Sequence, residues 1–241
     1  ADESPTGFVY VGGPSALWRL PKAGGTAEEV EAAASLLSPQ MGYELLIAGS
    51  QIFSVDDSIT GTTGKLWRIS SDGGQTWNVE DFASFPVAPA DKFRGGTVHG
   101  GKIYLLTHEA TTTVTSDIWS IDLNPASLPA AATLEATVDE HNCSGIAADA
   151  ANFYLACGTS ERVVRVDRTT GLVTLVTTEF DLSTVKNVVH ADDSDGDGIA
   201  NFLYLKGSEE DVGYVCNPAG ATPYANPLLN YGTSTTTYGL A

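Results

Sequence analysis

The chain has 241 residues and a formal net charge of −18, with 30 acidic residues against 12 basic ones. Such an acidic surface repels phosphate backbones and anionic lipids, so we expect neither nucleic acid nor a membrane surface as a partner. No apolar run approaches the roughly 18 residues that a membrane-spanning helix needs. The sequence begins Ala1-Asp2-Glu3, without Met. This start favours a secreted, periplasmic or cell-surface protein whose leader has been removed.

An apolar pattern returns about every 50 residues along the chain. The central residues of its five copies are spaced by 49, 52, 45 and 50 positions, at Trp18, Trp67, Trp119, Val164 and Tyr214. A fixed period of this size, made of short alternating runs, is typical of repeat architectures, and four strands per repeat are typical of a β-propeller. The sequence therefore predicts an all-β fold, a single five-bladed β-propeller over residues 1–241.

Each repeat is expected to contribute four short antiparallel strands, bounded by Gly, Asp or Thr. The first repeat supplies only three of them. In chain order the expected strands are 8–11, 17–20 and 27–31; 44–48, 51–55, 66–70 and 76–80; 97–98, 102–106, 118–122 and 133–138; 144–148, 152–157, 162–167 and 172–177; and 187–191, 201–206, 213–216 and one near 228.

The strand missing from the first repeat has a counterpart at the C-terminus. The segment 237–241, read on into Ala1 and Asp2, matches the pattern of 143–149 in the fourth repeat. We expect this C-terminal strand to join the first blade, because closing the array removes a sheet edge that would otherwise invite aggregation.

Two sequence stretches resemble known propeller repeats. The first is Leu17-Trp18-Arg19-Leu20-Pro21-Lys22-Ala23-Gly24-Gly25-Thr26, and the second is Gly145-Ile146-Ala147 with Asp149 and Phe153-Tyr154. Both are similar to repeats of YWTD- and NHL-type propellers. The resemblance implies the propeller fold, although those families usually have six or more blades.

A third stretch, Ser70-Ser71-Asp72-Gly73-Gly74-Gln75-Thr76-Trp77, is similar to the Asp-box (BNR-like) motif S-x-D-x-G-x-T-W. Asp72 can accept backbone N–H groups across the turn, and Trp77 can pack between sheets. In the families that carry it, this motif is structural and lies away from the active site, so the resemblance implies a structural role here.

A cluster of aspartates points to a cation. Asp193, Asp195, Asp197 and Gly198 occupy positions 1, 3, 5 and 6 of a D-x-D-x-D-G loop, and the carbonyl of Ile199 can add a further oxygen. The loop resembles those of EF-hands, dockerins and thrombospondin type-3 repeats, which implies calcium. At position 12, however, Tyr204 replaces the glutamate of the EF-hand, so Asp192 or a distant carboxylate would have to complete the shell. The alternative is a solvated acidic turn. The predicted site lies between the two inner strands of the fifth blade, on the face opposite the usual ligand entrance of a propeller, so its calcium would be structural.

The three cysteines divide into a pair and a single residue. If Ala148 pairs with Asn152 in the hairpin of the fourth blade, Cys143 lies directly opposite Cys157. A cross-strand disulfide between them is one prediction, and two buried thiols are the other. Cys216 is expected to be buried and reduced, and no Cys/His spacing favours zinc.

We expect a ligand to bind on one face of the propeller. This face is built by the loops that enter the innermost strands and by the loops between the second and third strands. These loops converge on the axis and differ most in length, and loop variation is where function usually lies. The predicted ligand-binding residues on this face are Asp56, Asp57, His108, Glu109, Glu140, His141 and Tyr231.

Three functions remain open at this stage. The first is a secreted, non-catalytic module that binds a glycan, a peptide or a small molecule on this face. The second is a glycosidase- or lactonase-type hydrolase that uses Glu44, Glu140 and His141, because axial carboxylates serve glycoside hydrolysis. The third is a structural or assembly module. A sialidase is disfavoured, because five of the six arginines lie on or beside the third strands, away from the axis. Fold alone does not decide among the three.

Overall fold

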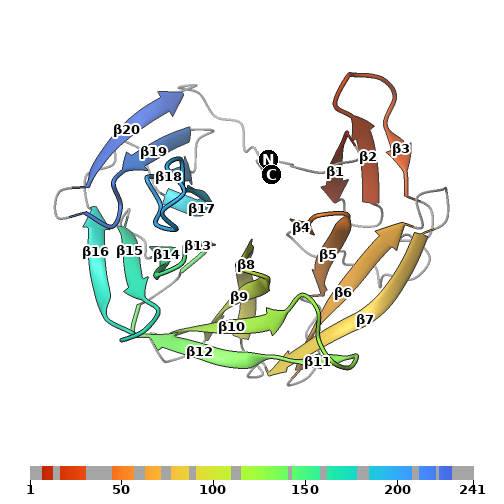
Figure 1. Ribbon diagram of the computed structural model, residues 1–241, viewed down its shortest axis with the longest axis horizontal. Coiled ribbons are helices and arrows are strands. Elements are labelled where there is room, and N and C mark those ends of the chain that lie inside the picture. Colours follow the sequence, from red (N-terminus) through yellow and green to blue (C-terminus); the bar gives the residue numbers. More distant parts are fainter. Residues whose placement is uncertain are drawn as a thin grey trace. The chain divides into compact units, whose positions relative to one another are not determined.

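The computed structural model describes residues 7–12, 17–30, 45–56, 63–71, 77–86, 91–109, 115–140, 143–157, 162–177, 185–207, 212–220 and 223–229. These residues form twenty β-strands and no helix, arranged in five small sheets (Figure 1). Four of the sheets take their strands in chain order. The architecture is that of a five-bladed β-propeller with mostly four strands per blade, as the repeat predicts.

The chain divides into two compact units, and each is described by itself. The first unit holds residues 1–92 and 121–133 and contains two sheets. One sheet has the order β1-β2-β3 and the other β11-β7-β6-β5-β4. Their strands are β1 (Phe8–Gly12), β2 (Leu17–Pro21) and β3 (Glu28–Glu29), and β4 (Leu45–Ala48), β5 (Gln51–Asp56), β6 (Thr63–Ser71), β7 (Trp77–Pro86) and β11 (Ala130–Ala131).

The second unit, residues 93–120 and 134–240, contains most of the other three sheets. Their orders are β8-β9-β10-β12, β13-β14-β15-β16 and β17-β18-β19-β20. The strands are β8 (Asp91–His99), β9 (Lys102–Glu109), β10 (Ser116–Asp122) and β12 (Thr133–Val138); β13 (Ile146–Ala148), β14 (Asn152–Cys157), β15 (Arg162–Asp167) and β16 (Val173–Thr177); and β17 (Val185–Asp192), β18 (Phe202–Gly207), β19 (Val212–Cys216) and β20 (Tyr224–Leu229).

Apolar side chains from neighbouring sheets form the core within each unit. In the second unit, Tyr104 of β9 packs with Phe153 of β14, their ring centroids 5.0 Å apart. A further cluster joins β14 and β15 to Leu203 and Val215 of the next sheet. In the first unit, Tyr10 contacts the edge of Trp77 at 6.2 Å, within a cluster that includes the buried Leu17. Burial of such side chains between sheets is what stabilises stacked blades.

The predicted strands recur with small shifts at their ends, but three differences stand out. The first is β11, which pairs in parallel with Ala83 and Ser84 of β7 and has no counterpart among the predicted strands. The second is length: β6, β7 and β8 are longer than their alternating runs indicated. The third concerns the predicted closing strand, 237–241, which lies outside the described residues. Its role therefore stays a prediction.

Candidate functional site

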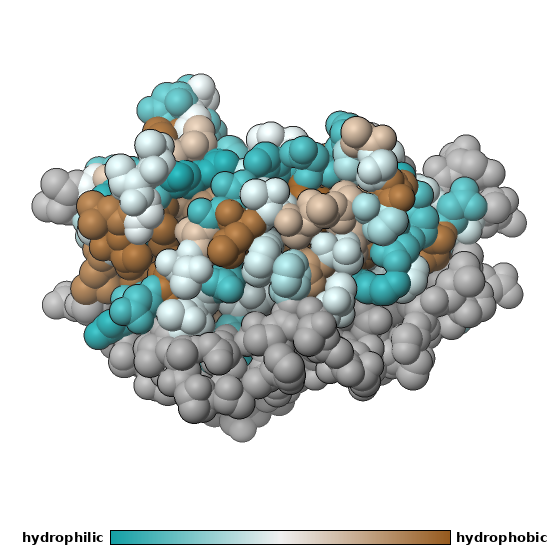
Figure 2. Space-filling model, turned by 90° about the horizontal axis from the view of Figure 1, so that it is seen from below, coloured by the Kyte–Doolittle hydropathy of each residue, from teal (hydrophilic) through white to brown (hydrophobic). Residues whose placement is uncertain are grey.

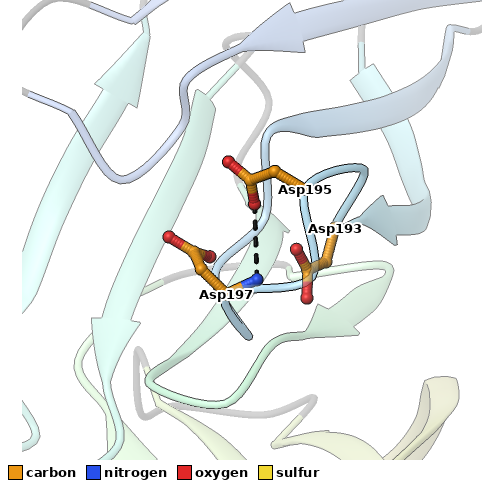
Figure 3. Close-up of side chains that lie close together, drawn as sticks. All are labelled: Asp193, Asp195 and Asp197. Atoms are coloured by element: carbon orange, nitrogen blue, oxygen red, sulfur yellow. Dashed lines mark hydrogen bonds between the residues drawn. The ribbon is translucent and has the colours of Figure 1, made fainter.

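The aspartate-rich loop connects β17 to β18, as the sequence predicted. The side chains of Asp193, Asp195 and Asp197 are exposed, and one carboxylate oxygen from each lies within 4.8 Å of the others. Figure 3 shows the three carboxylates on one short loop, with Asp195 accepting the backbone N–H of Asp197. Among the described residues this is the one group of three His, Cys, Asp or Glu side chains that could hold a metal ion.

Backbone hydrogen bonds to the aspartates fold this loop. The two oxygens of Asp193 accept the N–H groups of Gly196 and Gly198, each at 2.8 Å. Asp197 accepts the N–H of Ile199 at 2.7 Å. Gly198 has a φ of +88°, which other residues rarely adopt, so the turn requires glycine at this position. The pattern of alternating aspartates therefore forms the tight turn that a D-x-D-x-D-G loop needs.

The charge of Asp193 is stabilised by the same contacts. Desolvation acts to raise the pKa of this carboxyl, but the hydrogen bonds from the backbone N–H groups of Gly198 and Gly196 outweigh it and lower the pKa below its usual value. The carboxylate is thus ionised at neutral pH.

A residue that the sequence analysis missed closes the loop. The side-chain oxygen of Asn201 accepts the N–H groups of Ser194 at 2.7 Å and Asp195 at 3.2 Å. Asp192 ends β17, where its backbone carbonyl accepts the N–H of Asn201, and it is not part of the group of three. Tyr204 lies within β18, stacked on His190.

The loop is anchored to the turn between β13 and β14. Asp149 in that turn is only 2% exposed, and its Oδ2 atom accepts the N–H of Ala200 at 3.0 Å and the hydroxyl of Tyr154 at 2.7 Å. Its Oδ1 atom accepts the N–H groups of Ala151 and Asn152 at 2.8 and 2.6 Å. A single buried carboxylate therefore holds its own turn and the end of the aspartate-rich loop.

Arg168 lies beside this turn. Its guanidinium is 5.0 Å from the ring centroids of both Tyr104 and Phe153, and it donates hydrogen bonds to the carbonyl of Asp149 at 2.6 Å and to the hydroxyl of Tyr104. Burial, followed by the charge of Arg168, lowers the pKa of the neighbouring His99, and the charges of nearby carboxylates oppose this in part. The arrangement binds β9, β14 and the Asp149 turn together.

The opposite ends of β13 and β14 belong to the predicted ligand-binding face. Glu140 forms an ion pair with Arg162, N to O 3.6 Å, and its backbone carbonyl accepts the hydroxyl of Ser116 at 3.3 Å. His108, near the end of β9, is buried at 3% exposure. Of the predicted ligand-binding residues, these two have described side chains.

The other residues of this face are not described in the same detail. Asp56 and Glu109 end strands β5 and β9, and no side-chain contact is described for them. Asp57, His141 and Tyr231 lie outside the described residues, and so does Glu44 of the hydrolase hypothesis. Their assignment to this face therefore stays a prediction. The centre of the Asp-box, 72–76, is also outside the described residues, whereas its Trp77 packs against Tyr10.

The predicted disulfide is confirmed: Cys143 and Cys157 are bonded, and Cys216 is a buried free cysteine. The register on which the prediction rested was wrong by one residue, since Ala148 pairs with Phe153 instead of Asn152. Asp149 holds the observed register: its N–H donates to the carbonyl of Asn152 at 3.0 Å, and its carboxylate accepts the N–H groups of Ala151 and Asn152, so the turn closes around two residues. Ala156 then bonds to both Ser144 and Gly145, a bulge that returns the two cysteines to opposite positions.

We expect a thiol reagent to modify one cysteine, Cys216, in the denatured but unreduced protein. Reduction should expose all three thiols. It should also cost about 3 kcal/mol of stability, the effect of freeing a loop of about 15 residues. Thiol titration with and without reductant, combined with urea unfolding, measures both quantities. Three thiols before reduction would contradict the disulfide.

Comparisons with known proteins support the fold. No family model and no curated protein matches the chain. A chain of the Nidogen/Laminin complex is similar with a TM-score of 0.61 and 13% identity, over 89% of this chain and 73% of that one. A luciferin-regenerating enzyme is similar with a TM-score of 0.56 and 14% identity, over 85% of this chain and 67% of that one.

The extracellular domain of a one component system from B. thetaiotaomicron also matches, with a TM-score of 0.57 and 14% identity, over 95% of this chain but 31% of that one. At these identities the likeness shows a β-propeller and nothing finer. Within the described residues, no helix has the length and apolar character to cross a membrane.

Proposed function

We propose that this chain is a calcium-stabilised, partner-binding β-propeller that works outside the cytoplasm. The observation that carries the proposal is the loop between β17 and β18, where three exposed carboxylates come within 4.8 Å of one another. Calcium prefers six to eight oxygen ligands, often from aspartates at alternate positions of a tight loop and from a backbone carbonyl.

The residues of the loop fit this ion. Asp193, Asp195 and Asp197 would supply carboxylate oxygens, and the carbonyl of Ile199 is the proposed backbone ligand. Asp192 is the proposed additional acid, and water would complete the shell. The role is structural, because the loop is anchored through Ala200 to the buried Asp149. An ion that holds the loop would therefore also hold the turn between β13 and β14.

Chelation tests the calcium proposal. An ion that binds only the folded state, at a free concentration of about 100 times its dissociation constant, adds about 2.7 kcal/mol to the free energy of unfolding. For a chain of this size, that corresponds to a melting temperature roughly 5–10 °C higher. EDTA should remove that increment and added calcium should restore it. Unchanged melting in both directions would reject the calcium site.

A pair of matched variants separates the ion from the fold of the loop. Asp197→Asn keeps the oxygen that accepts the N–H of Ile199 but removes a charge, so it should weaken calcium binding at least tenfold by calorimetry. Asp167→Asn is the control, because Asp167 also accepts backbone N–H groups in an exposed turn but lies outside the loop. Equal affinity in the two variants would contradict the assignment of ligands.

The proposed location outside the cytoplasm is argued from the disulfide. Disulfides such as Cys143–Cys157 persist in oxidising compartments and are rare in the cytosol. The similar structures include the extracellular domain of a one component system and a chain from a complex with laminin. Both are consistent with a propeller that binds a partner outside the cell.

The proposed binding surface is the face that carries Glu140. Its ion pair with Arg162 lies next to the disulfide, because Arg162 is the register partner of Cys157. The disulfide-bonded strands therefore hold these two charges in place. The proposed ligand is a glycan, a peptide or a small molecule. A glycan array combined with a hydrolase substrate screen tests the proposal. Binding that is lost in Glu140→Ala supports it, and turnover that needs Glu44 and Glu140 would favour the hydrolase instead.

A further inference from the structure

Within the part of the chain that the structure describes, the outer edge of the sheet β13-β14-β15-β16 is open. Among the described residues no strand pairs with the outer side of β16. Leu172 and Leu175 on this edge are 66% and 48% exposed. Figure 2 shows apolar side chains gathered on the left of the view, the side on which Figure 1 places β16. Exposed apolar residues on an unpaired strand favour pairing with another chain.

The other four outermost strands carry features that oppose such pairing. Strand β3 consists of Glu28 and Glu29, β12 contains Glu135, and β20 contains Pro227. Part of the outer side of β7 is covered by β11. Charges, proline and covering segments are the usual protection of sheet edges. In contrast, residues 169–178 include no charged residue and no proline, although the chain carries a net charge of −18.

The hydrogen-bond pattern determines which residues of β16 face outward. The N–H of Asp167 donates to the carbonyl of Leu172 at 3.0 Å, which makes these two a hydrogen-bonded pair. Hydrogen-bonded and non-hydrogen-bonded pairs alternate along an antiparallel ladder. Two residues after Leu172, Thr174 therefore directs its backbone N–H and C=O groups to Arg165 of β15. The backbone groups of Val173 and Leu175 therefore point to the open edge. A bulge opposite Val163 and Val164 ends this regular stretch after Leu175.

We propose that β16 binds a second copy of this chain, strand to strand and antiparallel, about a twofold axis at Thr174. In this register Val173 of each copy exchanges both backbone hydrogen bonds with Leu175 of the other, because these are the residues whose backbone groups face outward. Thr174 then lies opposite its own equivalent as a non-hydrogen-bonded pair. Aliphatic and Thr–Thr pairs across strands are both favourable, and no like charges oppose each other.

Self-complementarity argues for a second copy over an unrelated strand. The central residue Thr174 is flanked by Val173 and Leu175, so reversing the strand places apolar residues against apolar residues in the same register. Two copies of such an acidic chain repel each other at long range, and a neutral edge is where this repulsion is smallest. The dimer should therefore strengthen when salt screens the remaining charge. This inference is independent of the calcium and ligand proposals.

Analytical ultracentrifugation of the full chain tests the dimer. We expect a concentration-dependent dimer whose dissociation constant rises at least tenfold in Leu175→Lys. The matched control is Leu134→Lys on the outer strand β12, where the leucine is 47% exposed and the same charge should leave the dimer unchanged. Both sites are exposed, so both variants should melt as the unmodified protein does.

A cysteine at the predicted axis tests the register. Thr174→Cys should form an intermolecular disulfide under mild oxidation, since the Cα atoms of a non-hydrogen-bonded pair lie about 4.5 Å apart. Thr133→Cys on β12 should not. A monomer at all concentrations up to about 1 mM would overturn the proposal. So would a dimer that Leu175→Lys leaves intact, or equal cross-linking of the two cysteine variants.

Discussion

Replacing Asp149 by asparagine is expected to lower the free energy of unfolding by about 2–4 kcal/mol, because it leaves buried donors without an acceptor. Each carboxylate oxygen accepts hydrogen bonds from at least two donors: Ala151 and Asn152 on Oδ1, and Tyr154 and Ala200 on Oδ2. Either orientation of an asparagine amide directs its NH₂ group at two of these donors. Urea unfolding followed by circular dichroism measures the loss.

The control for this prediction is Asp167→Asn in the same sheet. Asp167 also accepts the N–H groups of two residues that follow it, Thr169 and Thr170, but these contacts are exposed to solvent. Water can replace them, so the control should lose far less stability than Asp149→Asn. If the two variants unfolded at the same urea concentration, the buried carboxylate would not be the anchor that its contacts indicate.

Tyr154 is the one donor of this group that can titrate, and its environment keeps it protonated. Burial, followed by its hydrogen bond to the carboxylate of Asp149, raises the pKa of the Tyr154 hydroxyl well above its ordinary value. The hydroxyl therefore stays protonated at and above physiological pH and donates to Asp149 throughout. The loss in Asp149→Asn should accordingly be the same at pH 7 and pH 9.

Local patterns made the strands and the aspartate-rich loop predictable from the sequence. Strand alternation has a period of two residues, and the aspartates of the loop are two residues apart, so a short window contains the whole signal. Strands β12, β14 and β15 have the bounds that their alternating runs predicted. The glycine that the turn requires, Gly198, is part of the same short pattern.

Long-range contacts could not be predicted in this way. Asp149 and Ala200 are 51 residues apart, and Asp149 appears in the sequence as an ordinary turn aspartate. Strand β11 has only two residues and forms because it pairs with β7, so the sequence contains no alternating apolar run that would predict it. The one-residue shift in hairpin register is held by the contacts of Asp149 as well. A bulge then compensated for it, which is why a wrong register still gave the correct disulfide.

The second large effect on stability is expected at Arg168. Arg168→Met, which keeps much of the apolar stem, should lower the free energy of unfolding by about 2–3 kcal/mol. It removes the hydrogen bonds to the carbonyl of Asp149 and the hydroxyl of Tyr104, and the stacking of the guanidinium on two rings. Arg162→Met is the matched control, because the Arg162 side chain is exposed and its ion pair with Glu140 is long.

The imidazole of His99 reports whether the charge of Arg168 acts as the contacts indicate. Burial and then Arg168 lower the pKa of His99 in the folded protein, so the unfolded chain binds its proton more readily. The protein should therefore lose stability as pH falls through about 6.5, the ordinary histidine pKa. Arg168→Met should raise the pKa of His99 in an NMR titration and weaken this loss. Arg168→Lys keeps the charge but not the planar stacking, so it should cost stability while leaving the histidine pKa low. The same histidine pKa in all three proteins would show that burial alone lowers it and that the guanidinium acts only through packing.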